Sequence, residues 1–319
     1  MAARLVLPPD APREEWLEAR RQGVTASEVA TVLGLSPWDS AFNLYWRKLG
    51  ELDEQPDNDA MSLGRHLEPW IADRWAEDHP EWHVQQSGLY ASTERAWQLA
   101  TPDRRLTHHT ALATSVLEIK TSGTYEGWGP DGSDEIPPYY RAQVLWQLDV
   151  LGLEVGHVTC LFLSSRTRRD YLVRYDEADV KLMREAAQEF MARIERQDPP
   201  PIDHHPATTA ALKTLHPDVE DVEAEVPDHL ATWYADACRA LAEAKERKAA
   251  IEHKLRAAAG SARRLVTAAG EPVATRSICE RSSIDVDRLR REHPDAYAAC
   301  RTTTTVDTLR PARSRKDKA

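Results

Sequence analysis

The sequence predicts an α/β fold in which helices flank a mixed central sheet, followed by a C-terminal helical and hairpin extension. The prediction rests on three observations. Helical and strand patterns alternate up to about residue 197. Of the 319 residues, 41% are hydrophobic, enough for one large core or a core with an added module. The chain has no run of about 18 apolar residues, and its opening residues lack a signal-peptide pattern, so we expect a cytoplasmic protein with no membrane partner.

Four helices are expected before the first strand. The first three are each closed by a glycine: EEWLEARRQ, TASEVATVLGL and SAFNLYWRKLG. Thr25 and Glu28 have the spacing of a capping box, so a helix should begin at or near Ser27. SLGRHLEPWIADRWAEDH predicts the fourth helix, with Pro69 in its first turn or at a kink.

Strands follow, then a helix, a second set of strands and a last helix. The alternation and β-branched content of strands occur in HVQQSGLYAS, RAWQLATPD and ALATSVLEIKTS. IPPYYRAQVLWQLDVLG has a helical pattern, and GHVTCLFL and RDYLVRYD predict a strand pair. Asp176 can cap the amphipathic helix that follows. This order predicts an α/β core with a mixed sheet covered by helices.

The chain is expected to divide into three parts. Residues 1–197 form the α/β domain, and residues 198–229, rich in proline and acid, form a linker or extended strap. Residues 230–319 contain a long helix, a small hairpin with a helix, and a basic tail. Apolar positions spaced by four and three residues from Leu230 to Leu255 predict either a helix packed on its own domain or a coiled coil between copies.

Charge and cysteine content exclude several classes of protein. The formal net charge of -11 argues against a protein that coats DNA through a general basic surface, although it permits a local basic groove. The four cysteines are far apart and never form a CxxC motif, so neither a disulfide framework nor a thiolate metal cluster is expected.

Acidic and basic side chains in two of the expected strands suggest a chemical site. In VLEIKTS, strand alternation places Glu118 and Lys120 on one face, roughly 7 Å apart. Asp103 follows a proline in TPDRRL, and if the two strands pair as a hairpin, both carboxylates can face one site. Paired carboxylates suit Mg²⁺, and an adjacent lysine can orient or deprotonate water or stabilise charge on phosphorus. This is the chemistry of phosphodiester hydrolysis.

These residues also match a known motif. PD followed by ExK, from Asp103 to Lys120, is the signature of the PD-(D/E)XK nuclease fold, although the motif alone is weak. Three further stretches resemble the YqaJ-like viral recombinase and lambda-type exonuclease family: RRQGVTASEVATVLGLSPW with the NLYWRKLGE helix, GRHLEP, and YYRAQVLWQLDVLG. The resemblance covers about residues 12–176, and more loosely a stretch near the C-terminus.

The resemblance implies roles for individual residues. Asp103 and Glu118 would bind the metal ion, with the backbone carbonyl of Ile119 as a further ligand, and Lys120 would serve the attacking water. Gln143, four residues before Gln147, would bridge the lysine region and the DNA backbone, or else be an ordinary polar position.

Glu68 would complete the acidic set, directly or through water. The sequence supports this assignment independently, because Glu68 shares a helix face with Ile71, Ala72 and Trp75. A carboxylate on a buried stripe needs a partner, and a metal ion can be that partner.

The resemblance further implies a pocket for a 5′-phosphate. Arg21 and Ser27 match the residues that hold the phosphate in lambda-type exonucleases, Thr25 lies nearby, and Ser122 is a further candidate. Free backbone N–H groups at a helix start and a bidentate arginine are physically suited to phosphate. The alternative is that Thr25 and Glu28 only cap a helix while Arg21 is solvated.

Together, the resemblance implies a Mg²⁺-dependent 5′-to-3′ exonuclease that acts on double-stranded DNA with a 5′-phosphate end and leaves 3′ single strands for phage-type homologous recombination. Mn²⁺ is an alternative ion, since both metals accept oxygen ligands. The implied partners are a single-strand annealing protein and further copies of the chain in a ring. Two other functions stay open: an endonuclease or DNA-repair nuclease of the same fold, and a catalytically silent DNA-binding or assembly module.

Overall fold

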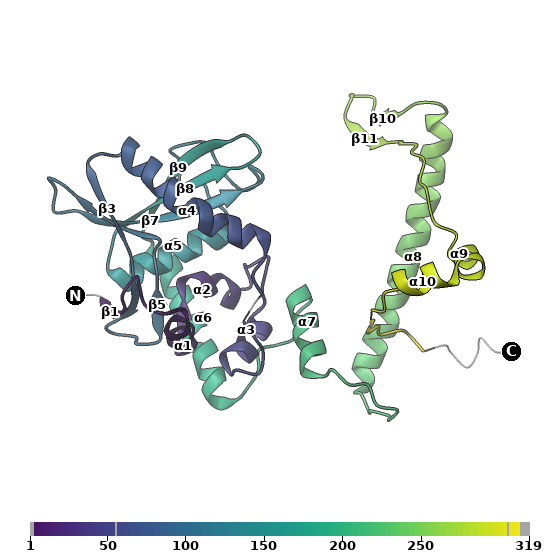
Figure 1. The fold of residues 1–319 in the computed structure, drawn as a ribbon, viewed down its shortest axis with the longest axis horizontal. Helices are drawn as coiled ribbons and strands as arrows, with labels where there is room; N and C mark the ends of the chain where they lie inside the picture. The colour runs from purple at the N-terminus through teal and green to yellow at the C-terminus, as the bar shows by residue number, and fades with distance from the viewer. Residues whose placement is uncertain (1–2, 55, 305, 313–319) are drawn as a thin grey trace. The chain divides into compact units, whose positions relative to one another are not determined.

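The protein, seen here in a computed structural model, is described for residues 3–54, 56–304 and 306–312. Its chain divides into two units, Met1–Asp218 and Val219–Ala319 (Figure 1). The first unit has mixed sheets flanked by helices, and the second is helical with one hairpin, so the predicted fold class is confirmed. Most of the predicted basic tail lies outside the described residues.

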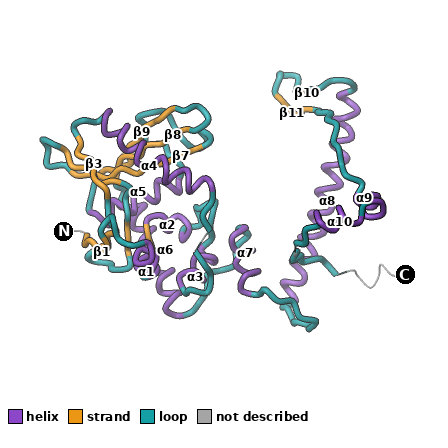
Figure 2. The backbone as a smooth tube through the Cα atoms, in the orientation of Figure 1, coloured by secondary structure: helices purple, strands orange, loops and turns teal. Residues whose placement is uncertain are grey.

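A five-stranded mixed sheet in the order β3-β6-β7-β8-β9 is the centre of the first unit (Figure 2). Only β7 and β8 pair in parallel, and the other neighbours are antiparallel. A parallel pair needs a long crossover, and here the crossover contains helix α5. The strands are β3 (Trp82–Gln86), β6 (Arg104–His108), β7 (Thr114–Ser122), β8 (Val155–Phe162) and β9 (Thr167–Arg174).

A smaller sheet of four strands has the order β1-β4-β5-β2. Its edge strand β2 pairs in parallel with β5, which places the start of α2 beside α5. The strands are β1 (Ala3–Leu7), β2 (Val24–Thr25), β4 (Leu89–Ser92) and β5 (Gln98–Ala100).

Seven helices of the first unit surround these sheets. Helix α4 packs on β7, and its buried residues are Ile71, Ala72 and Trp75, the stripe that the sequence predicts. Pro69 lies in the interior of α4 rather than in its first turn, because the Asn58 side chain caps the helix eleven residues earlier. The helices are α1 (Arg13–Arg21), α2 (Ala26–Val32), α3 (Ala41–Lys48), α4 (Asp59–Asp78), α5 (Pro138–Leu151), α6 (Glu177–Arg196) and α7 (Pro206–Leu215).

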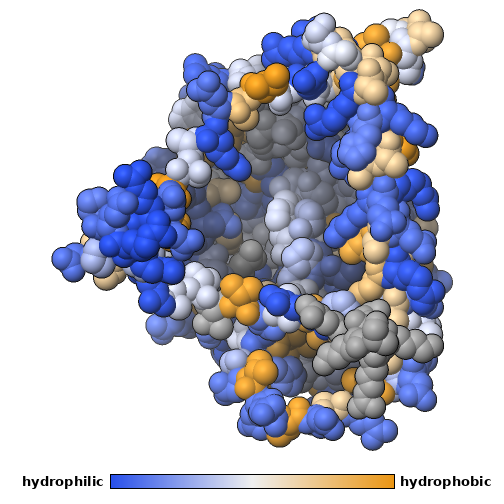
Figure 3. All heavy atoms as spheres, turned by 90° about the vertical axis from the view of Figure 1, so that its right-hand side faces the viewer, coloured by the Kyte–Doolittle hydropathy of each residue, from blue (hydrophilic) through white to orange (hydrophobic). Residues whose placement is uncertain are grey.

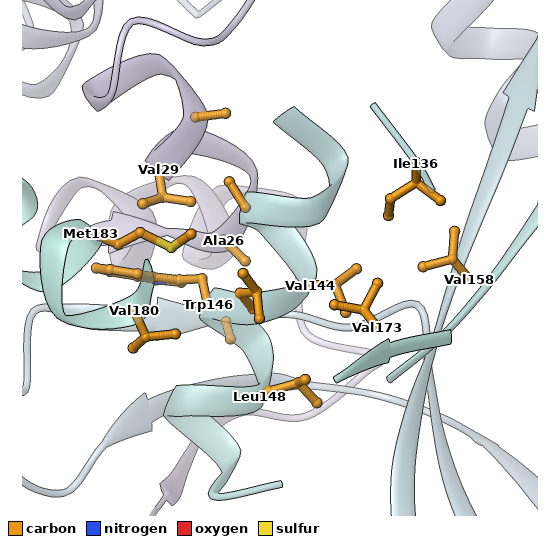
Figure 4. Packing of buried hydrophobic residues seen from close by; sticks show 14 of the residues in the cluster. Ala26, Val29, Ile136, Val144, Trp146, Leu148, Val158, Val173, Val180 and Met183 are labelled. Atoms are coloured by element: carbon orange, nitrogen blue, oxygen red, sulfur yellow. The ribbon is translucent and has the colours of Figure 1, made fainter. Parts of the chain in front are cut away.

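Helix α5 is the centre of the hydrophobic core. It lies between strands β8 and β9 on one side and helices α2 and α6 on the other, so its side chains are buried around most of its circumference (Figure 4). Trp146 is fully buried, and its indole N–H lies within hydrogen-bonding distance of the carbonyls of Val24 and Leu99. The core therefore fixes α5 against both sheets.

The expected linker at 198–229 contains α7, which packs on α3, and the first unit extends to Asp218. In the second unit, none of the described side chains is buried. Its elements are α8 (Asp228–Ala259), β10 (Arg264–Val266), β11 (Pro272–Thr275), α9 (Val286–Glu292) and α10 (Pro294–Cys300).

One face of the molecule is mainly polar. Hydrophilic residues dominate the face in Figure 3, with single apolar residues between them. Among the described residues, no helix is both long and apolar enough to pass through a bilayer.

The turn that leads into α2 is fixed by a buried lysine. Lys48 Nζ donates hydrogen bonds to the carbonyls of Arg20 at 2.5 Å and Gly23 at 2.6 Å, and to Glu28 Oε2 at 2.8 Å. Glu28 Oε2 also accepts from the backbone N–H of Thr25 at 2.9 Å, and the predicted capping box is present. Burial alone would raise the pKa of Glu28, but Lys48 and Arg20 lower it to about 2.

Gly23→Ala should destabilise the protein. A Cβ at this position would lie 2.0 Å from the carbonyl oxygen of Trp97, and backbone cannot move aside without disturbing the neighbouring strand. We expect a loss of roughly 1–3 kcal/mol in the free energy of unfolding, from denaturant titration. Gly64→Ala is the matched control, because outside its own helix backbone the added Cβ would approach only Thr121 Oγ1, at 3.9 Å, and alanine favours a helix. Equal effects of the two changes would contradict the packing argument.

Glu28→Gln should give a pH-dependent loss of stability. The pKa of Glu28 is lowered, so its stabilising contribution is complete above about pH 4.5 and is lost as the pH falls toward 2. We expect a loss of roughly 2–4 kcal/mol near neutral pH, which becomes smaller below about pH 4.5. Denaturant titrations at several pH values measure it, with Glu18→Gln on the exposed face of α1 as control. A loss that is the same at all pH values would show that the charge is not the cause.

Candidate active site

Strand β7 brings a carboxylate and an ammonium together. Glu118 is 1% exposed, and Lys120 lies two residues later on the same face of the strand. Lys120 Nζ donates to Glu118 Oε1 at 2.6 Å. Burial would lower the pKa of Lys120, but Glu118 and Asp103 raise it above its ordinary value, so the lysine is a cation near neutral pH.

The hairpin of β6 and β7 places Asp103 at the same site. Arg104 pairs with Leu117 across the two antiparallel strands, so Asp103, one residue earlier, lies across from Glu118. Asp103 Oδ2 accepts a hydrogen bond from the backbone N–H of Ile119 at 2.7 Å. The two strands therefore pair as a hairpin, which is the condition for the two carboxylates to face one site.

Helix α5 contributes two amides to Glu118. Gln143 Nε2 donates to Glu118 Oε1 at 2.5 Å, and Gln147 Nε2 donates to Oε2 at 2.7 Å. The two glutamines are one helical turn apart, so they face the strand together. Gln147 is completely buried, and its second amide atom, Oε1, has no hydrogen-bond partner. Both carboxylate oxygens of Glu118 thus have donors from this chain.

Helix α4 brings Glu68 to the edge of the same cluster. Its side chain is about one-third exposed, and Oε1 accepts from Arg104 Nη1 at 2.6 Å. The same guanidinium nitrogen donates to the backbone carbonyl of Asp103 at 2.6 Å. Arg104 therefore links Glu68 to the Asp103 backbone.

The acidic side chains are chemically suited to a divalent metal ion. Burial raises the pKa of Asp103 well above its ordinary value, and the nearby Glu118 and Glu68 carboxylates raise it further, against the opposing effect of Lys120. A divalent cation would relieve this repulsion, and carboxylate oxygens are the ligands that Mg²⁺ and Mn²⁺ accept. In the described ranges no three His, Cys, Asp or Glu side chains are already arranged around an ion site. The carboxylates of Glu68 and Glu118 instead accept hydrogen bonds from Arg104, Lys120 and Gln143.

The residues proposed for phosphate lie in two places. Ser27 Oγ accepts from Arg20 Nη2 at 3.2 Å and lies 3.1 Å from the Thr25 hydroxyl. Arg21 is exposed and forms an ion pair with Glu18 at 3.8 Å.

Ser122 lies at the end of β7, where its hydroxyl donates to the carbonyl of Thr124 within a local turn. Among the described contacts, none joins Ser122 to the start of α2. The structure thus brings Thr25 and Ser27 together with Arg20, rather than with Arg21 or Ser122.

Three contributors were not selected by sequence analysis. Arg20 lies next to the arginine that the resemblance indicates, and Arg104 follows the PD aspartate directly. Gln147 received less weight than Gln143, although their spacing of four residues already placed both on one helix face.

The chain is similar in sequence to known proteins. Residues 15–154 match the family model described as the YqaJ-like viral recombinase domain. A curated relative, described as uncharacterized protein YqaJ of Bacillus subtilis (strain 168), is 24% identical over 298 residues, which cover 89% of each chain.

Two solved structures of proteins described as exonucleases are similar to this chain. The alkaline exonuclease LHK-Exo from Laribacter hongkongensis is 23% identical with a TM-score of 0.47, covering 58% of this chain and 94% of that chain. A phage related exonuclease from Haemophilus somnus 129PT is 10% identical with a TM-score of 0.43, covering 55% and 94%. With TM-scores below 0.5, neither likeness carries an argument about this chain.

The family match contains all six residues of the cluster, which are Glu68, Asp103, Glu118, Lys120, Gln143 and Gln147. It confirms the family resemblance that the sequence motifs indicate. Residues 15–154 of this chain are therefore similar to the YqaJ-like viral recombinase domain.

Proposed function

We propose that the protein degrades one strand of double-stranded DNA in the 5′-to-3′ direction from a 5′-phosphorylated end and leaves a 3′ single strand for phage-type homologous recombination. The YqaJ-like domain supports a deoxyribonuclease role. The observation that carries the proposal is the buried Glu118 carboxylate, which lies across the hairpin from Asp103 and in contact with Lys120. This combination suits the hydrolysis of a phosphodiester.

Asp103 and Glu118 would hold the metal ion, with the carbonyl of Ile119 and with Glu68 directly or through water. When bound, Mg²⁺ or Mn²⁺ would supply a Lewis acid for the phosphate and an acidified water. Glu118 is oriented for this role because Gln143 and Gln147 donate to its two oxygens.

Lys120 would act on the attacking water or on the phosphate. With both neighbouring carboxylates ionised its pKa is raised, so in that state the lysine is an ammonium that orients water or stabilises negative charge on phosphorus. Proton acceptance by Lys120 would require its carboxylate neighbours to be neutralised first.

The 5′-phosphate would bind where Arg20 Nη2 meets Ser27, beside the Thr25 hydroxyl, with Arg21 on the same turn. Guanidinium and hydroxyl donors suit phosphate oxygens. A ring of several copies, a single-strand annealing partner and a cytoplasmic location belong to the same proposal, and the family resemblance supports the first two.

A strand-resolved digestion tests this function. Linear duplex labelled on each strand, with or without a 5′-phosphate, is compared with closed circular duplex in Mg²⁺, in Mn²⁺ and in chelator. We expect loss of the 5′-phosphorylated strand from its 5′ end, no cleavage in chelator and an intact circle. Cleavage of the circle would favour the endonuclease alternative, and retained DNA binding without hydrolysis would favour the silent module.

The same assay tests the site when it is applied to Asp103→Asn, Glu118→Gln and Lys120→Ala. Each variant should lose roughly 10²–10⁴-fold in rate, because each removes a metal ligand or a group that acts at the phosphate. Circular dichroism should show that the variants remain folded. Lys181→Ala, on the exposed face of α6, is the control and should keep full activity. Full activity of the Lys120 or Asp103 variant would refute the site.

A further inference from the structure

An exposed tryptophan lies at the rim of the candidate active site. Trp38 precedes α3, and 55% of its surface is exposed. Its ring centroid is 4.9 Å from that of Tyr139 in an edge-to-face arrangement and 5.9 Å from that of Tyr140. Both tyrosines belong to the first turn of α5, the helix whose Gln143 side chain donates a hydrogen bond to Glu118.

Tyr140 connects this aromatic group to the lysine of the site. Lys120 Nζ lies 4.8 Å from the centroid of the Tyr140 ring, and the same ring lies 5.9 Å from that of Trp38. Both the distance from Lys120 Nζ and the distance from Trp38 are measured to the centroid of the Tyr140 ring. The centre of the Trp38 ring therefore lies at most about 11 Å from Lys120 Nζ, which is close to three base-pair rises of a duplex. A nucleotide whose phosphate lies at Lys120 can therefore place a neighbouring base near Trp38.

The backbone around Trp38 is fixed rather than loose. Ser36 Oγ accepts hydrogen bonds from the backbone N–H groups of Trp38 and Asp39, both at 3.2 Å. The Asp39 carboxylate in turn accepts from Asn43 and Arg47, each at 2.7 Å. An exposed indole on an anchored segment is prepared to bind a ligand with little loss of conformational entropy.

The surroundings of Trp38 suit a base better than a phosphate. Trp38 lines a hollow of about 330 Å³ whose wall includes the carboxylates of Asp39, Asp53 and Glu54. Arg47 pairs with Asp39 at 2.7 Å and with Glu54 at 3.8 Å. One guanidinium among three carboxylates leaves the hollow with a net negative charge, which would repel a phosphate. A neutral aromatic ring can stack on the indole without this repulsion.

We propose that Trp38, supported by Tyr139, is a stacking site for an unpaired base at the end of the DNA substrate. The inference rests on the proposed nuclease function and adds to it a preference for an end whose first base has left the duplex. Stacking on an aromatic ring tolerates all four bases, so the site selects an unpaired end and not a sequence.

The test places 2-aminopurine, a fluorescent base whose emission falls when it is stacked, at the 5′ end of the duplex opposite a mismatch. Binding is followed in chelator, so that no cleavage occurs. Wild-type protein should quench the probe, and Trp38→Ala should abolish that quenching and weaken binding roughly tenfold. Trp38→Phe should keep most of both effects, because a ring remains. Trp233→Ala, which removes an exposed indole from α8, is the matched control and should match wild type.

The outcomes separate the stacking site from the proposed function. If wild type cleaves DNA in Mg²⁺ while Trp38→Ala quenches and binds as wild type does, the stacking site is overturned and the nuclease stands. Equal loss in Trp233→Ala would also overturn it. If quenching depends on Trp38 but wild type does not cleave DNA in Mg²⁺ or Mn²⁺, the base site stands and the nuclease proposal fails.

Discussion

The burial of the Glu118 carboxylate is the constraint on which the rest of the site depends. A charged group with 1% exposure is costly unless every oxygen has a partner. Lys120 from the same strand and two glutamines from α5 meet that requirement. The parallel pairing of β7 and β8 explains why α5 can reach Glu118. Parallel strands need a crossover connection, and the crossover helix α5 lies against β7, the strand that carries Glu118.

A bound divalent ion would give this cluster a second charge state with different chemistry. Without a metal ion, Arg104 and Lys120 compensate the three carboxylates, and the pKa of Asp103 is raised by burial and by its acidic neighbours. A divalent ion would take over that compensation and leave Lys120 available to water or phosphate. An acidic protein can in this way act on an acidic polymer, since the attraction is local and is supplied partly by the ion.

Much of the fold followed from periodicity, because the strands and helices of residues 1–197 are strongly patterned and have clear glycine and capping signals. Strand alternation also placed Glu118 beside Lys120. The remaining site contacts depend on which way a side chain points from its helix and on how the helices pack in the folded protein. Adjacent arginines on α1 point about 100° apart, and only packing decides that Arg20 rather than Arg21 meets Ser27. The contact between Arg104 and Glu68 depends on where α4 packs, and no local sequence pattern specifies that position.

The central claim is that Asp103 and Glu118 share one divalent cation beside Lys120. Crystals of the full chain grown in Mn²⁺ and examined by anomalous scattering test it most directly. The account predicts a single strong peak bonded to one oxygen of each carboxylate, at roughly 2.0–2.6 Å, with the lysine ammonium moved away from Glu118. No peak at saturating Mn²⁺, or a peak bonded to neither carboxylate, would contradict it.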